Sequence, residues 1–230
     1  LIAGADSYWN PVVGKPTIQY AEHYYFNEEH GYENVHVYLG PQYSGCYTHL
    51  SDGVGFANYT AHGSETSWAD PSFTVSNVYS LTNTDKYFWA MGNCCNAADW
   101  GYYSTSFGEA MIRAEEKAAF SYIGSCPVTY WWEDYYFGVG ATTITNRMPT
   151  FEETTMGNYD AQFLEDTYNT IAAVPFVGNL AVAYSHTESG YESAATTRYY
   201  FEAYHVLGDA SIMPYRSMPS ENNVSHLPTV

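Results

Sequence analysis

Basic residues are scarce in this sequence of 230 residues. Lys and Arg together number 7, against 25 Asp and Glu, and the formal net charge is −18. Nucleic acid needs a basic surface to meet its phosphates, and an anionic membrane surface makes the same demand, so we expect neither as a partner. The acidic surplus either attracts cations and basic peptides or only keeps an extracellular protein soluble, and composition leaves both interpretations open.

Cysteines and long apolar runs are also few. The four cysteines, Cys46, Cys94, Cys95 and Cys126, have no CxxC spacing and no other metal-ligand pattern. Adjacent cysteines such as Cys94 and Cys95 rarely bridge each other, because the loop is too tight for disulfide geometry. No signal peptide is visible, and no apolar run reaches the length of a membrane span. A chain of this length buries roughly 70% of its unfolded surface, so it can fold without disulfides or metals.

Aromatic residues, in contrast, are abundant, with 25 Tyr and 6 Trp. With Asn, Thr, Ser and Gly between them, they are typical of an exported protein. The opening residues Leu1 to Asp6 resemble the end of a buried strand, and chains seldom begin within a strand. We therefore expect a processed fragment whose upstream sequence has been removed.

Three short apolar runs, at 53–60, 86–91 and 118–123, are each followed at once by small and polar residues. Such runs are typical of strands buried on both faces of a sheet. Helical patterns lie between and after them. Strands that alternate with helices predict an α/β fold with a mainly parallel sheet covered on both sides, a three-layer α/β/α sandwich.

Four helices are expected from their start and stop signals. Asp70 and Pro71 suit an N-cap and a first helical position. Ser106 and Glu109 form a capping box, and Gly208 is a stop signal. The expected helices cover 70–81, 106–118, about 160–174 and about 199–207.

Reactive residues follow two of the predicted strands. His62 comes just after the first run and Cys95 just after the second, 33 residues later, with one helix between. Such a crossover makes the two strands neighbours, and ligands bind beyond the carboxyl ends of parallel strands. A base beside a thiol activates it as a nucleophile. Gly63, which has no Cβ to hinder a substrate carbonyl, could donate its N–H with that of Cys95 to an oxyanion.

Each of these residues also has a plainer interpretation. A histidine before glycine is often a turn residue, and a buried cysteine is commonly an inert hydrophobe. Cys94 competes with Cys95 as nucleophile but is interpreted as a core residue. Asp6 ends an apolar stretch, where it would either orient an imidazole or cap the strand.

Acidic and aromatic residues meet after the third strand, in Trp131-Trp132-Glu133-Asp134. A carboxylate at the bottom of an aromatic-walled pocket would select a cationic side chain. Spacing alone favours the other interpretation, a surface acid in a loop rich in Tyr and Trp.

Long segments of the sequence resemble the gingipains, cysteine peptidases of the caspase–haemoglobinase type, and are most similar to the lysine-specific branch. The similar segments are FANYTAHGSETSWADP (56–71), LTNTDKYFWAMGNCC (81–95), EDYYFGVGA (133–141), TTMGNYDAQFLEDTYNT (154–170) and YYFEAYHVLGDASIMPYR (199–216). The resemblance runs from Gly4 to about Pro228. It implies a caspase-like fold for the whole chain, 1–230, as one catalytic domain.

The resemblance also implies roles for individual residues. His62 falls at the family's catalytic histidine, Cys95 at its nucleophile and Asp6 at the acid that supports the histidine. Asp134 falls at the acid that receives the substrate ammonium in the lysine-specific branch. The remaining implied positions are the specificity-pocket walls Thr60, Asn93, Tyr130 and Trp131, the oxyanion-hole amides of Gly63 and Cys95, and a structural calcium site at the Trp100 carbonyl and Glu109.

The sequence departs from the family in a few places. Ser106 stands where the family has cysteine, and Cys126 stands where it usually has serine. The smaller N-terminal subdomain of the family's catalytic unit is not in this chain, so a cleaved subdomain or propeptide is an expected partner. The resemblance further implies a bacterial protein that is secreted or held at the outer cell surface.

We therefore predict a cysteine endopeptidase that cleaves after lysine. One alternative is a related peptidase that prefers arginine or accepts either basic residue. The head group of arginine is longer and planar, so its pocket needs more room. The other is an extracellular binding homologue without catalysis, whose aromatic content would suit sugar or peptide stacking.

Overall fold

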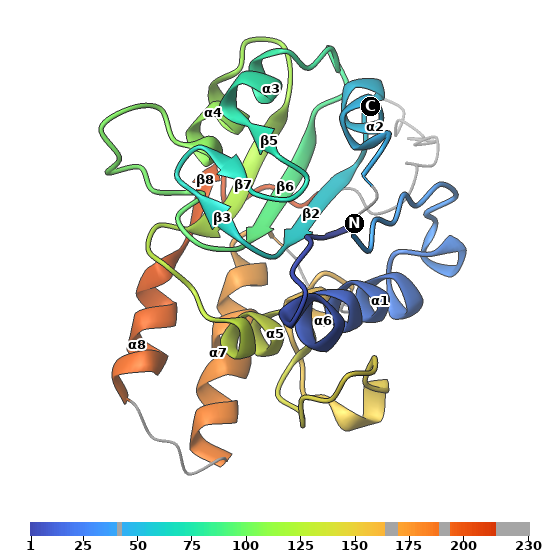
Figure 1. Ribbon diagram of the computed structural model, residues 1–230, viewed down its shortest axis with the longest axis vertical. Helices are drawn as coiled ribbons and strands as arrows, with labels where there is room; N and C mark the ends of the chain where they lie inside the picture. Colours follow the sequence, from blue (N-terminus) through green and yellow to red (C-terminus); the bar gives the residue numbers. More distant parts are fainter. Residues whose placement is uncertain (41–42, 164–169, 189–193, 215–230) are drawn as a thin grey trace, which may run out of the picture.

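The computed structural model describes residues 1–40, 43–163, 170–188 and 194–214 (Figure 1). Five strands form the main sheet in the order β1-β2-β6-β7-β8. All neighbouring pairs are parallel except β7 and β8, which are antiparallel. The strands are β1 (Ile2–Ala3), β2 (Phe56–Thr60), β6 (Phe88–Asn93), β7 (Ala119–Ser125) and β8 (Tyr204–Gly208). The predicted mainly parallel sheet, and its three apolar runs as strands, are confirmed.

Helices cover both faces of this sheet (Figure 1). In β6, Phe88 and Ala90 pack into one core, whereas Trp89 and Met91 pack into the other. The first core includes α2 (Cys46–Asp52), α3 (Val75–Tyr79) and α4 (Phe107–Arg113). The second includes α1 (Lys15–Tyr24), α5 (Trp131–Val139), α6 (Asn158–Ala161), α7 (Ala173–Glu188) and α8 (Ala194–Ala203). The three-layer α/β/α prediction is therefore confirmed. The short helical turns are η1 (Asn10–Gly14), η2 (Glu28–His30) and η3 (Phe151–Glu153).

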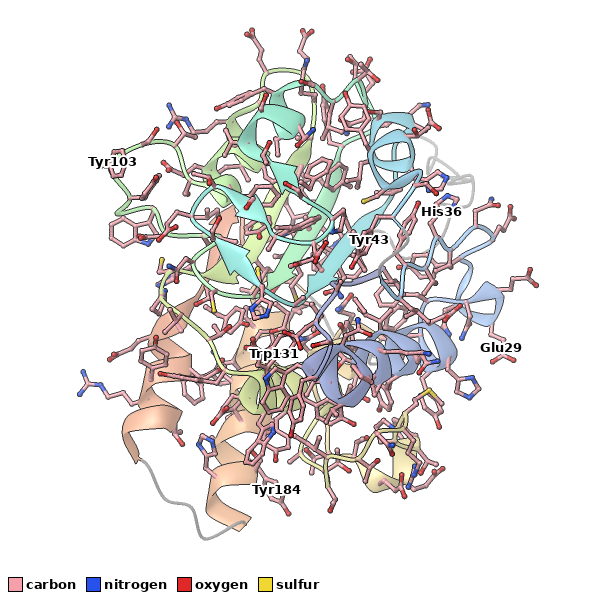
Figure 2. All side chains as sticks on the ribbon, viewed as in Figure 1. Glu29, His36, Tyr43, Tyr103, Trp131 and Tyr184 are labelled. Atoms are coloured by element: carbon pink, nitrogen blue, oxygen red, sulfur yellow. The ribbon has the colours of Figure 1, made fainter. Side chains whose placement is uncertain are left out.

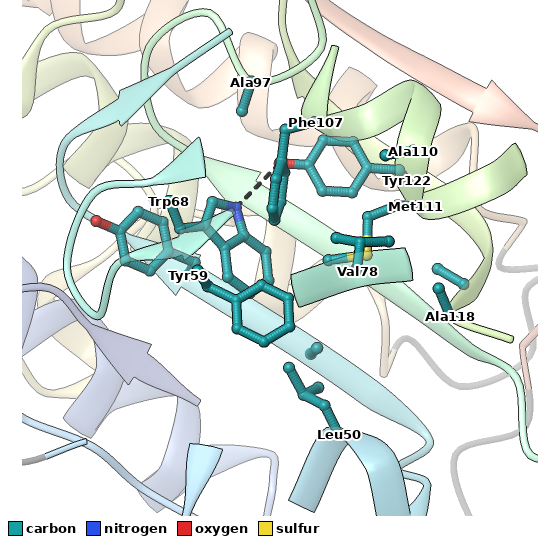
Figure 3. Close-up of a cluster of buried hydrophobic side chains, with 14 of the residues drawn as sticks. Leu50, Tyr59, Trp68, Val78, Ala97, Phe107, Ala110, Met111, Ala118 and Tyr122 are labelled. Carbon is teal, nitrogen blue, oxygen red and sulfur yellow. Dashed lines mark hydrogen bonds between the residues drawn. The ribbon is translucent and has the colours of Figure 1, made fainter. Parts of the chain in front are cut away.

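A small second sheet follows β2 directly and is built from β3 (Gly63–Ser64), β4 (Ser67–Trp68) and β5 (Phe73–Thr74). Its Trp68 is buried in the first core, where its ring stacks on Tyr59 at 5.1 Å between centroids. Trp68 Nε1 donates a hydrogen bond of 3.1 Å to the Tyr122 hydroxyl beside Phe107 (Figure 3). This packing fixes the hairpin that begins at Gly63, immediately after His62.

The predicted start of the helix at Asp70 is wrong. Phe73 and Thr74 form β5 instead, because Phe73 packs into the first core. The cap of α3 is Thr74, whose hydroxyl accepts from the Asn77 N–H while the Asn77 side chain accepts from the Thr74 N–H. The capping box of Ser106 and Glu109 is confirmed, but its helix ends at Arg113 instead of continuing to 118.

The structure also differs from the two expected C-terminal helices. Residues 204–208, expected to end a helix, form β8, because the outer edge of β7 takes an antiparallel partner. The expected helix over 160–174 is only partly tested, since 164–169 lie outside the described residues. Around that gap, α6 ends at Ala161 and α7 begins at Ala173.

Within the described ranges, no helix is both long and apolar enough to cross a bilayer.

Candidate active site

The candidate site lies beyond the carboxyl ends of β2 and β6. These strands are parallel neighbours, and their last residues, Thr60 and Asn93, are register partners. His62 and Cys95 each follow two residues later. The expected convergence of the two strand ends is therefore confirmed.

Asp6 and His62 form a hydrogen-bonded pair, with 2.9 Å between Asp6 Oδ2 and His62 Nε2. The other carboxylate oxygen accepts from the backbone N–H groups of Tyr8 (2.8 Å) and Trp9 (2.6 Å). Desolvation pushes the pKa of Asp6 upward, but the backbone donors and His62 outweigh it and hold that pKa below its usual value. Because Nε2 is engaged with Asp6, Nδ1 is the nitrogen left for other chemistry.

The imidazole of His62 also rests against Trp131. The two rings meet edge to face, 5.1 Å apart, and Trp131 in turn stacks on Trp9 at 5.9 Å. Figure 2 shows Trp131 in the middle of the molecule, beyond the arrowheads of the parallel strands. His62 remains half exposed, with 52% of its side chain accessible, so it can face a substrate.

The Cys95 sulfur is half-buried and contacts Thr129, in the loop between β7 and α5. The Thr129 N–H donates to Cys95 Sγ at 3.2 Å, and the thiol lies 3.6 Å from the Thr129 carbonyl. Among the described residues, no hydrogen bond joins this sulfur to His62. An N–H aimed at sulfur stabilises a thiolate, the reactive form.

Cys94 has the opposite environment. Its side chain is fully buried in the first core. Desolvation raises the pKa of the Cys94 thiol well above its usual value, and the neighbouring Cys95 and Asp134 raise it further. These properties agree with the interpretation of Cys94 as a core residue.

Gly63 approaches the cysteine pair so closely that a side chain would not fit. A Cβ on Gly63 would lie 2.5 Å from Cys94 Sγ and 2.6 Å from the Cys95 carbonyl oxygen. The Ala69 N–H donates to the His62 carbonyl, which makes Gly63 and its partner in β4 a pair that exchanges no hydrogen bond. The Gly63 N–H therefore points away from β4. The Cys95 N–H also has no acceptor among the described residues, so both amides are available to a ligand.

Asp134 lies in the first turn of α5 and is buried, with 5% of its surface exposed. Thr129 Oγ1 donates to Oδ2 at 2.6 Å, while the hydroxyls of Tyr204 and Tyr200 lie 2.9 and 3.2 Å from Oδ1. Burial raises the pKa of Asp134 to about 7, although these hydroxyls act in the opposite direction. No cationic side chain contacts Asp134 within the described residues.

Of the residues expected to line a pocket near Asp134, Asn93 contacts Asp134 directly and Tyr130 contacts its neighbour Tyr200. Asn93 is buried, donates to the Asp134 carbonyl at 2.8 Å and accepts from the Tyr204 hydroxyl at 2.6 Å. Tyr130 is exposed, and its N–H donates to the Tyr200 hydroxyl at 2.8 Å. Thr60 is buried at the end of β2, where its hydroxyl lies 3.4 Å from Asn58 Nδ2.

Trp100 and Glu109 are the residues expected to bind calcium. Glu109 accepts from the Ser106 N–H at 2.9 Å and lies 3.6 Å from Arg113. Trp100 is largely exposed. In the part of the chain that the structure describes, no group of three or more His, Cys, Asp or Glu side chains is placed to hold a metal. Calcium binding at these two residues stays a prediction.

Sequence reasoning missed the groups that support the two central side chains. The strand-end argument names no role for Thr129, although this residue follows the third strand as His62 and Cys95 follow theirs. The sequence predicts Tyr200 and Tyr204 in one helix, whereas they belong to α8 and β8. A strand-end position was a usable signal for Thr129, but nothing local marks the two tyrosines as partners of Asp134.

Comparison with known proteins gives a family and several relatives. The model of peptidase family C25 matches residues 7–215. Lys-gingipain from Porphyromonas gingivalis (strain ATCC 33277) is 58% identical over 222 residues, which cover 96% of this chain and 13% of that protein. The chain therefore spans only about an eighth of the length of this curated relative.

Two solved structures are similar over most of the chain. One, titled "Structure of Protease", has a TM-score of 0.95 and 54% identity and covers 100% of this chain and 51% of that one. The other, a complex of Porphyromonas gingivalis RgpB pro- and mature domains, has a TM-score of 0.68 and 20% identity. It covers 84% of this chain and 42% of that one and, at this identity, supports the fold alone. Together with the observed layers, the neighbours confirm the caspase-like fold.

Proposed function

This chain belongs to peptidase family C25, and on that premise we propose that it is the catalytic domain of a secreted cysteine endopeptidase that cleaves peptide bonds after lysine. The observation that carries the proposal is the Asp6–His62 pair, held beyond the same two strand ends as Cys95. The 58% identity to a protein named Lys-gingipain supports lysine as the residue before the cut.

In the proposed mechanism, Cys95 Sγ attacks the carbonyl carbon of the bond to be cut, and the thiol proton passes to His62. Asp6 holds Nε2, so Nδ1 accepts that proton. The N–H groups of Gly63 and Cys95 stabilise the oxyanion. His62 then protonates the leaving amine, which departs from a thioester. Water hydrolyses the thioester, which releases the acid and regenerates the thiol.

This mechanism requires His62 and Cys95 to meet when substrate binds. Hydrogen bonds between catalytic groups are often long without substrate and tighten in the complex. The His62 imidazole is half exposed and meets Trp131 edge to face, so burial does not prevent it from shifting toward Cys95 while Asp6 holds Nε2.

Asp134 is the proposed acceptor of the lysine ammonium, with Thr60, Asn93, Tyr130 and Trp131 as pocket walls. A buried carboxyl without a cationic neighbour is suited to a cation that the substrate brings. Both of its oxygens already accept hydroxyl hydrogen bonds, which leaves less room for the two parallel bonds of an arginine head than for a compact ammonium.

The further partners are also proposals. A complex of pro- and mature domains exists for a protein with the same fold, which supports a propeptide or upstream subdomain as a partner. The Porphyromonas relative supports a bacterial protein that acts outside the cell. Catalysis as proposed needs no metal, and calcium at Trp100 and Glu109 would have a structural role.

A cleavage map tests this proposal. The reduced protein is incubated with an unfolded protein substrate, and the new termini are identified by mass spectrometry. We expect cuts after lysine, and none with the Cys95→Ala variant. Cuts after arginine as well would favour the dual-specific alternative, and no cuts from a folded sample would contradict the proposal for this chain.

A further inference from the structure

One residue, Thr129, contacts both the proposed nucleophile and the proposed specificity group. Its backbone N–H donates to Cys95 Sγ at 3.2 Å, and its hydroxyl donates to Asp134 Oδ2 at 2.6 Å. Nothing in the mechanism above gives this residue a role. Thr129 therefore connects the two groups through one hydrogen bond from its backbone and one from its side chain.

The hydroxyl contact fixes where the N–H points. A threonine hydroxyl has a single hydrogen, and here the short distance to a carboxyl oxygen shows where it is directed. With that side chain held, the rotation of the adjoining peptide is restricted, because Thr is β-branched and has few χ1 states. The N–H is thereby kept on the Cys95 sulfur.

The neighbouring residues are held from the other side, by α8. The Tyr199 hydroxyl donates to the Val128 carbonyl at 2.7 Å, and the Tyr130 N–H donates to the Tyr200 hydroxyl at 2.8 Å. The Val128 carbonyl and the Thr129 N–H belong to one planar peptide unit, so the Tyr199 bond helps to orient that N–H from the carbonyl side. The Thr129 hydroxyl holds the same residue from its side chain, on Asp134.

We propose that Thr129 is a positioning residue, which holds its N–H on the Cys95 sulfur by anchoring its hydroxyl on Asp134. The carboxyl that receives the lysine ammonium is thus also the anchor of the group that supports the nucleophile. This inference rests on the proposed function for its kinetic consequence, but not for the reactivity of the thiol itself.

The first test measures that reactivity without any substrate. The rate at which iodoacetamide alkylates Cys95 is followed against pH, by mass spectrometry of the Cys95 peptide. In Thr129→Val, which keeps the shape and removes the hydroxyl, we expect the midpoint of alkylation to move to higher pH. The rate at neutral pH should fall about tenfold, because less thiolate is present.

Two matched variants separate positioning from a general loss of structure. Thr129→Ser keeps the hydroxyl and should restore the wild-type alkylation profile. Thr82→Val makes the same change at an exposed position and should leave the profile unaltered. An unchanged midpoint in Thr129→Val, with the melting temperature preserved, would overturn the proposal.

A double-mutant cycle then tests the connection through Asp134. If Asp134 is the anchor, Asp134→Ala should shift the alkylation midpoint as Thr129→Val does, and the double variant should shift it no further. Additive shifts would overturn the connection.

Turnover of a lysine reporter gives the kinetic arm. Thr129→Val should lower kcat more than it raises KM, because the ammonium can still reach Asp134. If wild-type protein cuts no lysine reporter, the proposed function fails, yet the alkylation cycle still decides the role of Thr129.

Discussion

Asp134 combines deep burial with three hydroxyl neighbours and no cationic contact in the described part of the chain. Two of those hydroxyls also face other acceptors. Tyr204 lies 2.6 Å from Asn93 Oδ1, and Tyr200 lies 3.2 Å from the Tyr130 carbonyl. Each tyrosine has one proton to give, so both cannot serve Asp134 fully. Such a carboxyl keeps its proton up to nearly neutral pH, in agreement with its pKa of about 7.

This pKa predicts how selectivity depends on pH. Only the ionised form of Asp134 pairs with an ammonium, and below pH 7 that fraction grows about tenfold with each pH unit. The ratio of kcat/KM for a lysine reporter to that for a norleucine reporter should therefore rise with pH and level off above about 7. Titration of the catalytic groups affects both reporters alike and cancels in the ratio.

The control for this experiment is Asp134→Ala. Its ratio should be low and independent of pH, because the cation has lost its partner. A wild-type ratio that does not vary between pH 5 and 8, or an equal loss on both reporters in the variant, would remove Asp134 from its proposed role.

Some site residues were predictable because a strand end marks them. His62 and Cys95 follow apolar runs whose parallel pairing could be deduced from the length of the crossover. Asp6 and His62 are 56 positions apart, and the residues alone leave open whether Asp6 orients an imidazole or caps a strand. Only the family resemblance favours the contact with His62. Tyr204 could not be found, because its contact with Asp134 depends on β8 pairing with the far edge of the sheet.

At the scale of single elements, α4 depends on its capping box. Ser106 is fully buried, its hydroxyl accepts from the Glu109 N–H, and the Glu109 carboxylate accepts from the Ser106 N–H at 2.9 Å. Ser106→Ala should lower the free energy of unfolding by about 1 kcal/mol, measured by urea denaturation. Ser104→Ala, at an exposed position of the preceding loop, should cost much less. Equal stability of both variants would show that packing alone holds the start of α4.

Helix boundaries are less predictable from the sequence than strands, because nearby residues can also cap a helix and because tertiary packing can extend one. Asp70 and Pro71 carry start signals, but the box made by Thr74 and Asn77 caps α3 four residues later. Spacing alone favours a loop rich in Tyr and Trp for residues 131–134, yet these residues begin α5. Its buried Tyr135, Phe137 and Val139 pack into the second core, a tertiary effect that local sequence does not specify.

At the scale of the whole molecule, the parallel sheet brings distant residues to one edge. β1, β2, β6 and β7 run in the same direction, so their carboxyl ends lie at one edge of the sheet. The segments that follow these strands therefore all begin at that edge. Asp6, His62, Cys95 and Thr129 come from those four segments in turn. The fold class could be predicted because alternating strands and helices permit few arrangements. The antiparallel β8 could not, because its sequence also suits a helix.

The central claim is that Cys95 and Asp134 together cut peptides after lysine. Its most direct test is hydrolysis of three reporter peptides that differ only in lysine, arginine or norleucine before the cut, by wild-type protein and by Cys95→Ala. We predict turnover of the lysine reporter well above the other two, and none by the variant. Equal turnover of all three reporters, or activity that survives in Cys95→Ala, would contradict the account.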